Sequence, residues 1–513
     1  MVKGMVAAGH PVTADAAAEI LSDGGNAFDA ALAGLLACLT PETILASLGG
    51  GGFMMAYDAS TTRTALYDFF VDTPIRKRLV EEIDFRSVDV DFGPATQAFH
   101  VGTGATAVPG FVPGLFAIHA DLCRLPMARI VEPAVRVARR GVKITSFQAY
   151  LFSILAPILT LEGAGKALYA PEDHVLAAGA WFRNPALADT LEHLAREGAD
   201  LFIHGEIGQA ILQQSAESGG HLALADLERY RVQKRRPLRW MHRGHTVFLN
   251  PAPAAGGPLI AFGLGLLEQL TSTHPAATTI AGAPSIVDLV RVMAEINEAR
   301  RLDGGRLTGL ADRELIAAHF ENFQGRPEAN RGTTHVSVID SAGNAAAASV
   351  SNGEGNGRLV GGYGFMMNNM LGEEDLNPGG SHAWRPGRRM SSMMSPTLLL
   401  APDGAWTALG SGGSNRIRTA ILQVACNLMD QGMPLDEAVD APRIHVEKCG
   451  TVSYEDRFGP AATAQLLAAF PAAHGWPERS MFFGGVHAVR RHPDGRLEGT
   501  GDARRAGVSA IVE

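Results

Sequence analysis

The sequence has few cysteines and no long apolar run, and each absence excludes a class of protein. Its four cysteines, Cys38, Cys123, Cys426 and Cys449, stand far apart with no Cys-x-x-Cys spacing, so neither a disulfide framework nor a cysteine metal site is expected. The longest apolar run, residues 30–39, is well short of the ~20 residues that a transmembrane helix needs. We therefore expect no membrane partner, and no motif calls for a metal or an organic cofactor.

Basic clusters and a secretory signal are missing as well. The chain has 44 Lys and Arg against 53 Asp and Glu, a net charge of −9, and no long basic block, which argues against a nucleic acid as partner. Residues 1–10 lack an apolar core followed by small residues, so a cytoplasmic location is predicted. With 46% hydrophobic and 19% charged residues, the 513-residue chain can bury a large core, and its partner is expected to be a small molecule.

Local signals predict helices at the start of the chain and a glycine-rich strand after them. Thr13 is expected to cap a helix over 14–22, and Asn26 a second helix over 27–39. Four glycines at 49–52 then lead into a strand at 53–57. Because no Gly-Lys-Ser/Thr follows and the run precedes a strand, we expect close backbone packing or a pocket wall there and not a phosphate loop.

Helical periodicity dominates the middle of the chain, and strand-like alternation follows it. Helices are expected at 115–122, 130–140, 186–197, 285–301 and 418–431. Strands are expected at 334–340, 345–351, 365–368, 396–401 and 406–409, the first two joined into a hairpin by a turn at 341–344. Helices on both sides of clustered strands indicate helices layered over sheets.

The most informative stretch is Gly332-Thr333-Thr334, at the start of that hairpin. If the peptide bond before Thr333 is cut, this residue carries a hydroxyl nucleophile and an α-amine that titrates near pH ~8 and serves as its base. The second strand runs back beside the first and brings Ser349 and Ser351 near Thr333, so we expect the Ser351 hydroxyl to hydrogen-bond the Thr333 hydroxyl. An ordinary strand start and an ordinary cross-strand Ser–Thr pair are the alternatives.

Two further clusters contain the residues that an acyl-transfer site needs. Ser391 and Ser392 precede a strand and can present hydroxyls and backbone amides to a carboxylate. The loop 410–416 lies between a strand and a helix, where small residues let consecutive N–H groups face an oxyanion, often worth ~3 kcal/mol per donor. A plain turn in the first case, and a generic glycine turn in the second, would look the same.

In their order along the chain, these motifs resemble the γ-glutamyltranspeptidase family of N-terminal-nucleophile hydrolases. The resemblance covers nearly the whole chain and is carried by residues 24–31, 49–52, 102–110, 333–335, 368–369, 391–397, 410–414 and 441–445. It implies an α+β fold, a four-layer αββα sandwich made as one precursor. That precursor would cut itself before Thr333 into a large subunit, 1–332, and a small subunit, 333–513.

The resemblance also implies roles for individual residues. Thr333 would attack first the Gly332 carbonyl and then a substrate amide, through an acyl-enzyme that water or an amine releases. Ser351 falls on the position of a supporting threonine. The other implied residues are Ser391, Ser392, Glu373 and Asn352 for substrate binding, and Gly413 and Ser414 for the oxyanion hole, with Gly412 and Gly413 as the other register.

Three departures from the family pattern concern the substrate. The Asp-Phe pair at 68–69 is followed by Phe70 where the family has an arginine for the α-carboxylate, so a charge-assisted contact is lost. Met370 stands where the family has a glutamine, although Glu373 can replace the acid that holds the α-amino group. The segment 375–388 is shorter than the lid-bearing segment of some relatives, which would leave the site open to larger groups.

The expected activity is γ-glutamyl hydrolysis or transfer, as on glutathione-like amides, by an enzyme built from its two subunits. An amidase for another short acyl amide, glutaryl- or oxamate-like, is the first alternative, because Phe70 replaces the glutamyl-binding arginine. A non-catalytic binding protein of the same fold is the second alternative.

Overall fold

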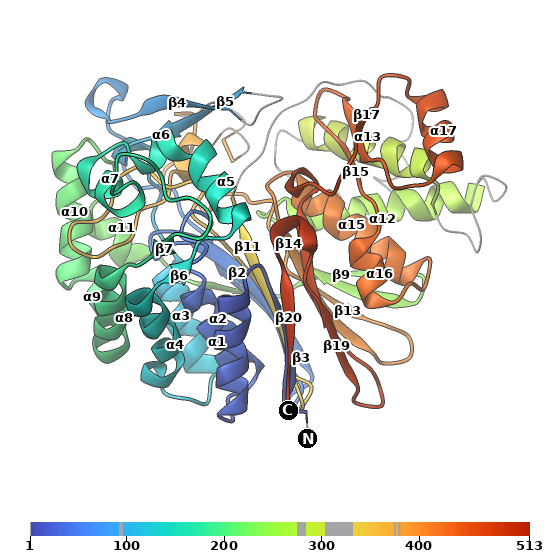
Figure 1. Ribbon diagram of the computed structural model, residues 1–513, viewed down its shortest axis with the longest axis horizontal. Helices are drawn as coiled ribbons and strands as arrows, with labels where there is room; N and C mark the ends of the chain where they lie inside the picture. Colours follow the sequence, from blue (N-terminus) through green and yellow to red (C-terminus); the bar gives the residue numbers. More distant parts are fainter. Residues whose placement is uncertain are drawn as a thin grey trace.

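Two β-sheets packed face to face carry helices on their outer faces (Figure 1). The computed structural model describes residues 2–91, 96–273, 284–302, 332–373, 376–377, 380 and 382–513. The seven-stranded sheet has the order β20 (Val508–Val512), β1 (Gly4–Ala8), β11 (Thr334–Asp340), β12 (Ala345–Ser351), β2 (Gly51–Asp58), β3 (Arg63–Phe69), β8 (Gln233–Arg235). The six-stranded sheet has the order β19 (Leu497–Thr500), β18 (Gly485–Arg491), β14 (Trp406–Gly412), β13 (Thr397–Leu400), β10 (His245–Leu249), β9 (Leu238–His242).

Helices form the two outer layers, so the expected αββα sandwich is confirmed. Figure 1 shows the first set beside the seven-stranded sheet and the second beside the six-stranded sheet. The first set is α1 (Pro11–Ser22), α2 (Ala27–Ala37), α3 (Phe111–Leu122), α4 (Met127–Arg140) and α8 (Pro185–Glu197). The second is α12 (Gly256–Thr273), α13 (Ile286–Leu302), α15 (Arg416–Met429) and α16 (Leu435–Asp440).

Smaller elements surround this sandwich. The remaining helices are α5 (Ser146–Ile154), α6 (Ala156–Leu159), α7 (Gly163–Tyr169), α9 (Asp200–Ile203), α10 (Glu206–Glu217), α11 (Leu224–Arg229) and α17 (Pro460–Ala469). The short sheets are β4 (Arg86–Asp91) with β5 (Thr96–Val101), β6 (Val142–Lys143) with β7 (Trp181–Phe182), and β15 (Ile444–Val446) with β16 (Val452–Glu455) and β17 (His474–Trp476). None of the helices in the described residues is both long enough and apolar enough to cross a bilayer.

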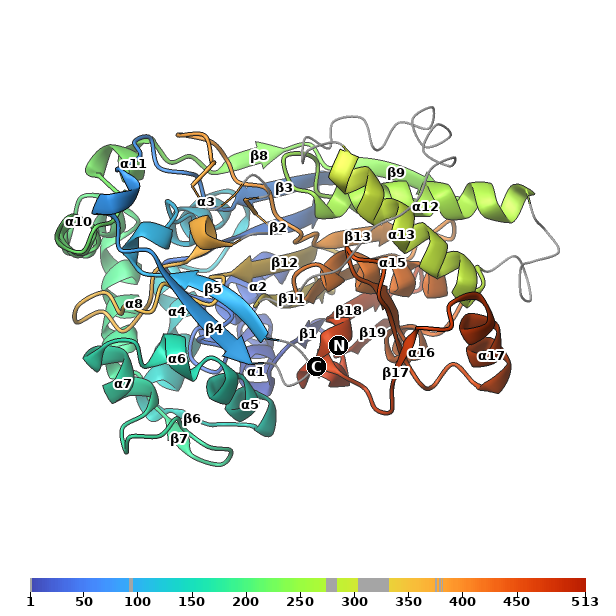
Figure 2. The ribbon, with the colours of Figure 1, turned by 90° about the horizontal axis from the view of Figure 1, so that it is seen from above.

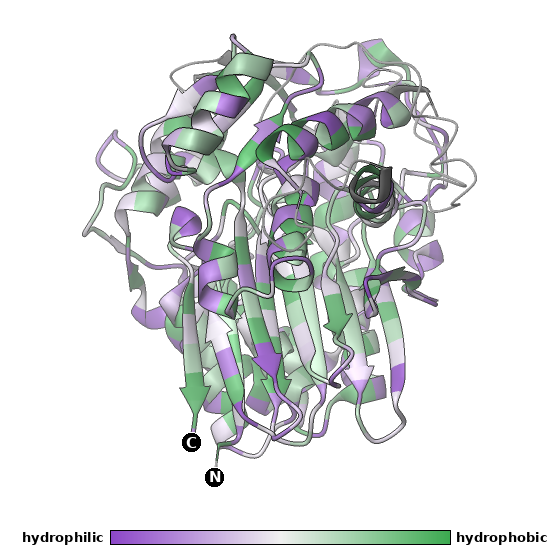
Figure 3. Ribbon diagram, turned by 90° about the vertical axis from the view of Figure 1, so that its right-hand side faces the viewer, coloured by the Kyte–Doolittle hydropathy of each residue, from purple (hydrophilic) through white to green (hydrophobic). Residues whose placement is uncertain are grey.

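The central strands of the seven-stranded sheet, β1, β11, β12 and β2, are buried on both faces. In β2, Met54 and Ala56 belong to the core shared with α1 and α2, whereas Phe53 and Met55 belong to the core between the sheets. Figure 3 shows mainly hydrophobic residues along the strands and mixed hydropathy on the outer helices. This period of two fits a strand that separates two apolar layers.

The central hairpin has the expected register, and parts of the chain that are far apart in sequence flank it. Strand β11 pairs antiparallel with β12, with Thr334 opposite Val350 and His335 opposite Ser349. On its other side β11 pairs with β1, which in turn pairs with β20 (Figure 2). The close packing expected at the glycine run is confirmed, since a Cβ on Gly52 would lie 2.4 Å from the Ser349 carbonyl oxygen of β12.

The expected cap of the first helix was wrong, and that of the second is confirmed. Helix α1 begins earlier, at Pro11, because His10 Nδ1 accepts the backbone N–H of Val12 and caps it. Thr13 lies inside the helix and is buried. Asn26 caps α2 in a reciprocal capping box with Asp29, as its position predicted.

The strand expected at 365–368 is also wrong. Met366 and Met367 form only isolated bridges, with Leu359 and Gly49. The chain turns there because the Asn368 side chain bonds the carbonyls of Gly49 and Ala107 and holds the segment across other loops. Strands β8, β9 and β10 lie in the region expected to be mainly helical.

Candidate active site

Thr333 lies where the start of β11 meets the end of β14 in the other sheet. It directly precedes β11, is 5% exposed, and its carbonyl oxygen faces the end of β14 in the other sheet. A Cβ on Gly412 would lie 2.1 Å from that oxygen, so only glycine allows this approach. The buried guanidinium of Arg505 donates to the same oxygen at 3.3 Å. The backbone of the candidate nucleophile is therefore held from the second sheet.

The carbonyl of Gly332 accepts two hydroxyl hydrogen bonds. Thr333 Oγ1 donates to it at 2.8 Å and Ser351 Oγ at 2.7 Å, in a chain that is uncut at this bond. The backbone N–H of Gly353 donates to Ser351 Oγ at 3.1 Å and orients that hydroxyl toward the carbonyl. The expected contact between the Ser351 and Thr333 hydroxyls is not formed, because both hydroxyls donate to the Gly332 carbonyl oxygen.

A small cavity of about 30 Å³ opens beside these groups. Its polar lining residues are Thr333, Ser351, Glu373, Ser392 and Ser414, all predicted from the sequence. Its apolar lining residues are Phe70, Met370, Leu376, Met393, Met394 and Ile417, and Gly332 completes the wall. Most of this wall is apolar, and no lysine or arginine of the described residues contributes to it.

Phe70, which stands in place of the expected arginine, is part of the apolar wall. It is 1% exposed and its ring stacks on that of Phe53, with centroids 5.5 Å apart. The nearby Arg389 does not replace the missing cation, because its guanidinium is paired with Asp68 and Asp72. The cavity therefore lacks the charged group with which the family holds an α-carboxylate.

The other predicted residues lie around this cavity at different depths. Gly413 has φ +121° and Ser414 φ +52°, so the oxyanion loop turns sharply just before α15 begins at Arg416. Ser414 reaches the cavity wall, and the positive end of the helix dipole faces the same place. Ser391, Asn352 and Gly413 are not among the lining residues, and the Asn352 amide instead lies 3.5 Å from the carbonyls of Met366 and Met367.

No histidine of the described residues lines this cavity. His335, two residues after Thr333, is fully buried, and its ring nitrogens bond Ser349 and Ser337 at 2.8 Å each. Burial holds the pKa of His335 well below its usual range. The described residues contain no group of three or more His, Cys, Asp or Glu side chains placed to hold a metal ion.

Sequence reasoning missed two buried ionisable groups behind the candidate nucleophile. Glu42 accepts hydrogen bonds from Thr334 Oγ1 at 2.6 Å and from Thr13 Oγ1 at 3.0 Å. Burial raises the pKa of Glu42 to about 7, although these hydrogen bonds and the charge of Arg505 oppose the rise. Burial also lowers the pKa of Arg505 to about 10. No local pattern marks either residue, since Glu42 reaches Thr334 and Arg505 reaches Thr333 only in the folded sheets.

Comparisons with known proteins show the family and the fold of this chain. A family model described as Gamma-glutamyltranspeptidase matches residues 13–512. The Acylase ACY 1 proenzyme of Pseudomonas sp. (strain SE83) is 30% identical, covering 99% of this chain and 94% of that protein. The Glutathione hydrolase proenzyme of Pseudomonas aeruginosa is 30% identical, covering 99% and 95%. The solved structure of a cephalosporin acylase from Bacillus halodurans is similar in fold, with a TM-score of 0.84, 23% identity, and coverage of 100% and 96%.

Proposed function

Because the chain belongs to the gamma-glutamyltranspeptidase family of N-terminal-nucleophile amidohydrolases and acyltransferases, we propose that it matures itself by cutting before Thr333 and then cleaves amides with that threonine. The observation that carries this proposal is the convergence of two hydroxyls, from Thr333 and Ser351, on the carbonyl oxygen of Gly332. A hairpin that served only the fold would not need two hydroxyl groups on one carbonyl oxygen.

Maturation starts with attack of Thr333 Oγ1 on the carbonyl carbon of Gly332. The Ser351 hydroxyl, already 2.7 Å from the carbonyl oxygen, stabilises the negative charge that develops there. The C–N bond then breaks, the nitrogen takes the hydroxyl proton and becomes the α-amine of Thr333, and the two parts are joined by an ester. Water hydrolyses the ester and leaves a large subunit, 1–332, and a small subunit, 333–513.

Turnover uses the groups that maturation exposes. The free α-amine, with an ordinary pKa near ~8, takes the Thr333 hydroxyl proton as the oxygen attacks a substrate amide. Backbone N–H groups of Gly413 and Ser414, at the start of α15, suit the oxyanion. The substrate amine leaves with a proton, and water or a second amine takes the acyl group from Thr333.

For the acyl group we favour a short chain without an α-carboxylate. The wall formed by Phe70, Met370, Met393 and Ile417 suits apolar carbon atoms. A γ-glutamyl group would leave its α-carboxylate without a cation, a loss that a serine hydroxyl offsets only in part. The similarity to the Acylase ACY 1 proenzyme, 30% identical, supports an acylase role for this chain.

γ-Glutamyl amides remain the second candidate, supported by two residues of the same cavity. Glu373 supplies a carboxylate for an α-ammonium group. Ser392 Oγ accepts the Met394 N–H at 3.1 Å, and its own proton remains to be donated to a carboxylate. A glutaryl group differs from a γ-glutamyl group in this cavity, because it brings a carboxylate but no ammonium group.

Three chromogenic anilides separate these candidates. Butyryl, glutaryl and γ-glutamyl anilides differ only by the carboxylate and the α-amino group, so the ratios of kcat/KM measure each group separately. We expect the butyryl anilide to be a better substrate than either anilide that carries a carboxylate. The reverse order would refute the apolar assignment but not the nucleophile, whereas no turnover of any amide by processed protein would count against the amidase itself.

A further inference from the structure

One buried guanidinium contacts the candidate nucleophile from the side away from the cavity. Arg505, at the end of the short 3-10 helix η8 (Ala503–Arg505), is 6% exposed and donates through Nη1 to the Thr333 carbonyl oxygen at 3.3 Å. A Cβ on Gly412 would lie 2.9 Å from Nη1, and a Cβ on Gly485 would lie 2.8 Å from Cδ. The two glycines therefore leave room for the arginine side chain to lie close to Thr333.

The charge of Arg505 is in excess in its surroundings. Arg443 and Arg504 pair with the Asp502 carboxylate at 2.6 and 3.3 Å, and Arg504 also pairs with Glu455 at 2.5 Å. All of these side chains are buried, so with Arg505 three guanidinium groups face two carboxylates. Among the described residues, no carboxylate forms an ion pair with Arg505 itself. Burial lowers the pKa of Arg505 to about 10, so its guanidinium still carries a charge at neutral pH.

The group that this charge affects most directly is the α-amine that a cut before Thr333 would release. A buried charge in excess costs folding free energy, so a neutral donor would hold the Thr333 carbonyl at lower cost. The amine nitrogen is three bonds from the carbonyl oxygen that Arg505 holds, which places it within about 8 Å of Nη1. Over that distance in a protein interior, a cation lowers the pKa of an amine by about one to two pH units.

Other ionisable groups lie near the same peptide: Glu42, Glu354, Glu373, His335, His487 and Arg416. Burial holds the pKa of His335 well below its usual range and lowers that of His487 to about 4, so neither ring is charged at neutral pH. Arg416 is paired with Glu447. The carboxyl groups act in the opposite direction, but Glu42 bonds Thr334 and Glu354 bonds the Gly332 N–H, whereas Arg505 bonds Thr333 itself.

We propose that Arg505 keeps the α-amine of the processed Thr333 neutral at neutral pH, so that the amine can accept the hydroxyl proton. This inference rests on the proposed function, because the amine exists only after the cut. Arg505 does not line the Thr333 cavity and acts through Thr333, so it is a positioning residue. Without its charge the amine would keep its proton up to a higher pH, and the enzyme would become active only above that pH.

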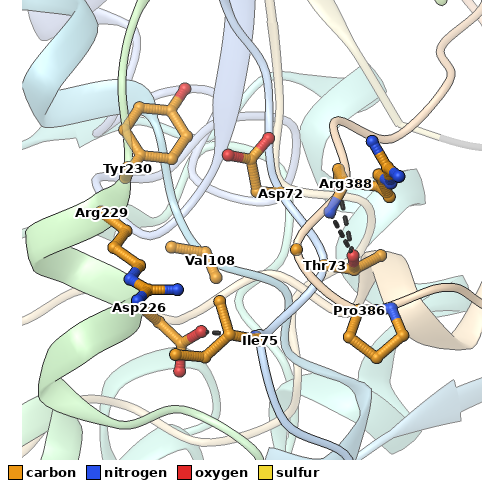
Figure 4. Close-up of a pocket in the computed structure, with 10 residues that line it drawn as sticks. Asp72, Thr73, Ile75, Val108, Asp226, Arg229, Tyr230, Pro386 and Arg388 are labelled. Atoms are coloured by element: carbon orange, nitrogen blue, oxygen red, sulfur yellow. Dashed lines mark hydrogen bonds between the residues drawn. The ribbon is translucent and has the colours of Figure 1, made fainter.

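Arg388 provides a matched control. It is exposed and lines a separate cavity of about 430 Å³, which shares no lining residue with the Thr333 cavity. Figure 4 shows Arg388 beside Thr73, whose Oγ1 accepts the Arg388 N–H at 2.9 Å. Arg388→Gln removes one positive charge, as Arg505→Gln does, but at a position that solvent screens and that does not contact Thr333.

The test is the pH dependence of kcat/KM for processed enzyme, measured with whichever of the three anilides is cleaved fastest. The acid limb of Arg505→Gln is expected about one pH unit above that of the wild type. Arg505→Lys keeps the charge, so its limb should stay at the wild-type position, as should that of Arg388→Gln. The position of a limb does not depend on the amount of active enzyme, so incomplete maturation of a variant does not affect it.

Glu42→Gln checks which group gives rise to the acid limb, because the pKa of Glu42 is raised by burial to about 7. We expect the limb to persist in this variant. A limb that disappears in Glu42→Gln overturns the inference, since Glu42 would then be the titrating group. An Arg505→Gln limb at the wild-type position in active enzyme also overturns it, and leaves the proposed function intact.

The wild type decides the question if Arg505→Gln yields no processed protein. Its acid limb is then expected below the value near ~8 of an ordinary α-amine, and a limb at or above that value overturns the inference. Processed wild-type protein that cleaves none of the three anilides would refute the proposed function, and this inference with it.

Discussion

Replacing Ser351 by alanine is expected to slow maturation far more than it lowers stability. Ser351 Oγ lies 2.7 Å from the Gly332 carbonyl oxygen, the atom on which charge develops when Thr333 attacks. Loss of one such donor typically slows acyl transfer by ~10²–10³-fold. The Gly353 N–H also loses its acceptor, which costs about 1–3 kcal/mol of folding free energy for a buried group.

The assay follows the 54.2 kDa precursor on denaturing gels as it converts into pieces of roughly 35 and 19 kDa. Ser351→Thr keeps a hydroxyl and is expected to mature at close to the wild-type rate. Ser349→Ala is the matched control, since it removes a serine two residues away on the same strand whose hydroxyl bonds His335 instead. Equal half-lives for Ser351→Ala and Ser349→Ala precursors would refute the assigned role of the Ser351 hydroxyl.

Three further perturbations test other parts of the structure. The pKa of Glu42 is raised to about 7, so the folded protein binds the Glu42 proton more tightly than the unfolded chain does. The stability that this proton contributes is lost as the pH rises from about 4.5 through 7. Glu42→Gln should therefore gain about 3 kcal/mol relative to the parent chain over that window, measured by urea unfolding of uncut Thr333→Ala chains, and a pH-independent difference would contradict it. Phe70→Arg should raise the γ-glutamyl-to-butyryl ratio of kcat/KM by about tenfold or more, and an unchanged ratio would show that position 70 does not contact the acyl group. Gly412→Ala should displace the Thr333 carbonyl and destabilise the fold by about 1–3 kcal/mol, which a melting temperature equal to that of the parent would disprove.

Much of the site could be predicted because its signals are local. Alternation and a turn predict the β11–β12 hairpin, and hairpin register brings Ser351 to the Thr333 end without tertiary information. The glycine loop before α15 was recognisable from its position between a strand and a helix. Of Ser391 and Ser392, only Ser392 lines the cavity. Which of the two serines does so depends on the path of the folded chain, and the local sequence does not predict it.

Other features could not be predicted, because they depend on contacts between distant parts of the chain. Glu42 and Arg505 lie near opposite ends of the sequence and meet at the Thr333–Thr334 peptide only when the sheets are formed. Thr13 is a good helix cap by propensity, yet its hydroxyl bonds the buried Glu42 instead. The segment 365–368 has strand-like composition, but Asn368 holds it across loops.

The order of strands in the seven-stranded sheet has a consequence for the lifetime of the enzyme. Strand β1, from the part before Thr333, pairs on both sides with strands from the part after it, β11 and β20. A chain cut before Thr333 would stay assembled, since separating the pieces would break the two ladders of β1, the ladders β2–β12 and β10–β13, and the core between the sheets. Once unfolded, however, the pieces would have to find each other by diffusion, so recovery would depend on concentration. The cut chain would then depend on slow unfolding to persist, whereas the uncut chain would refold as a single molecule.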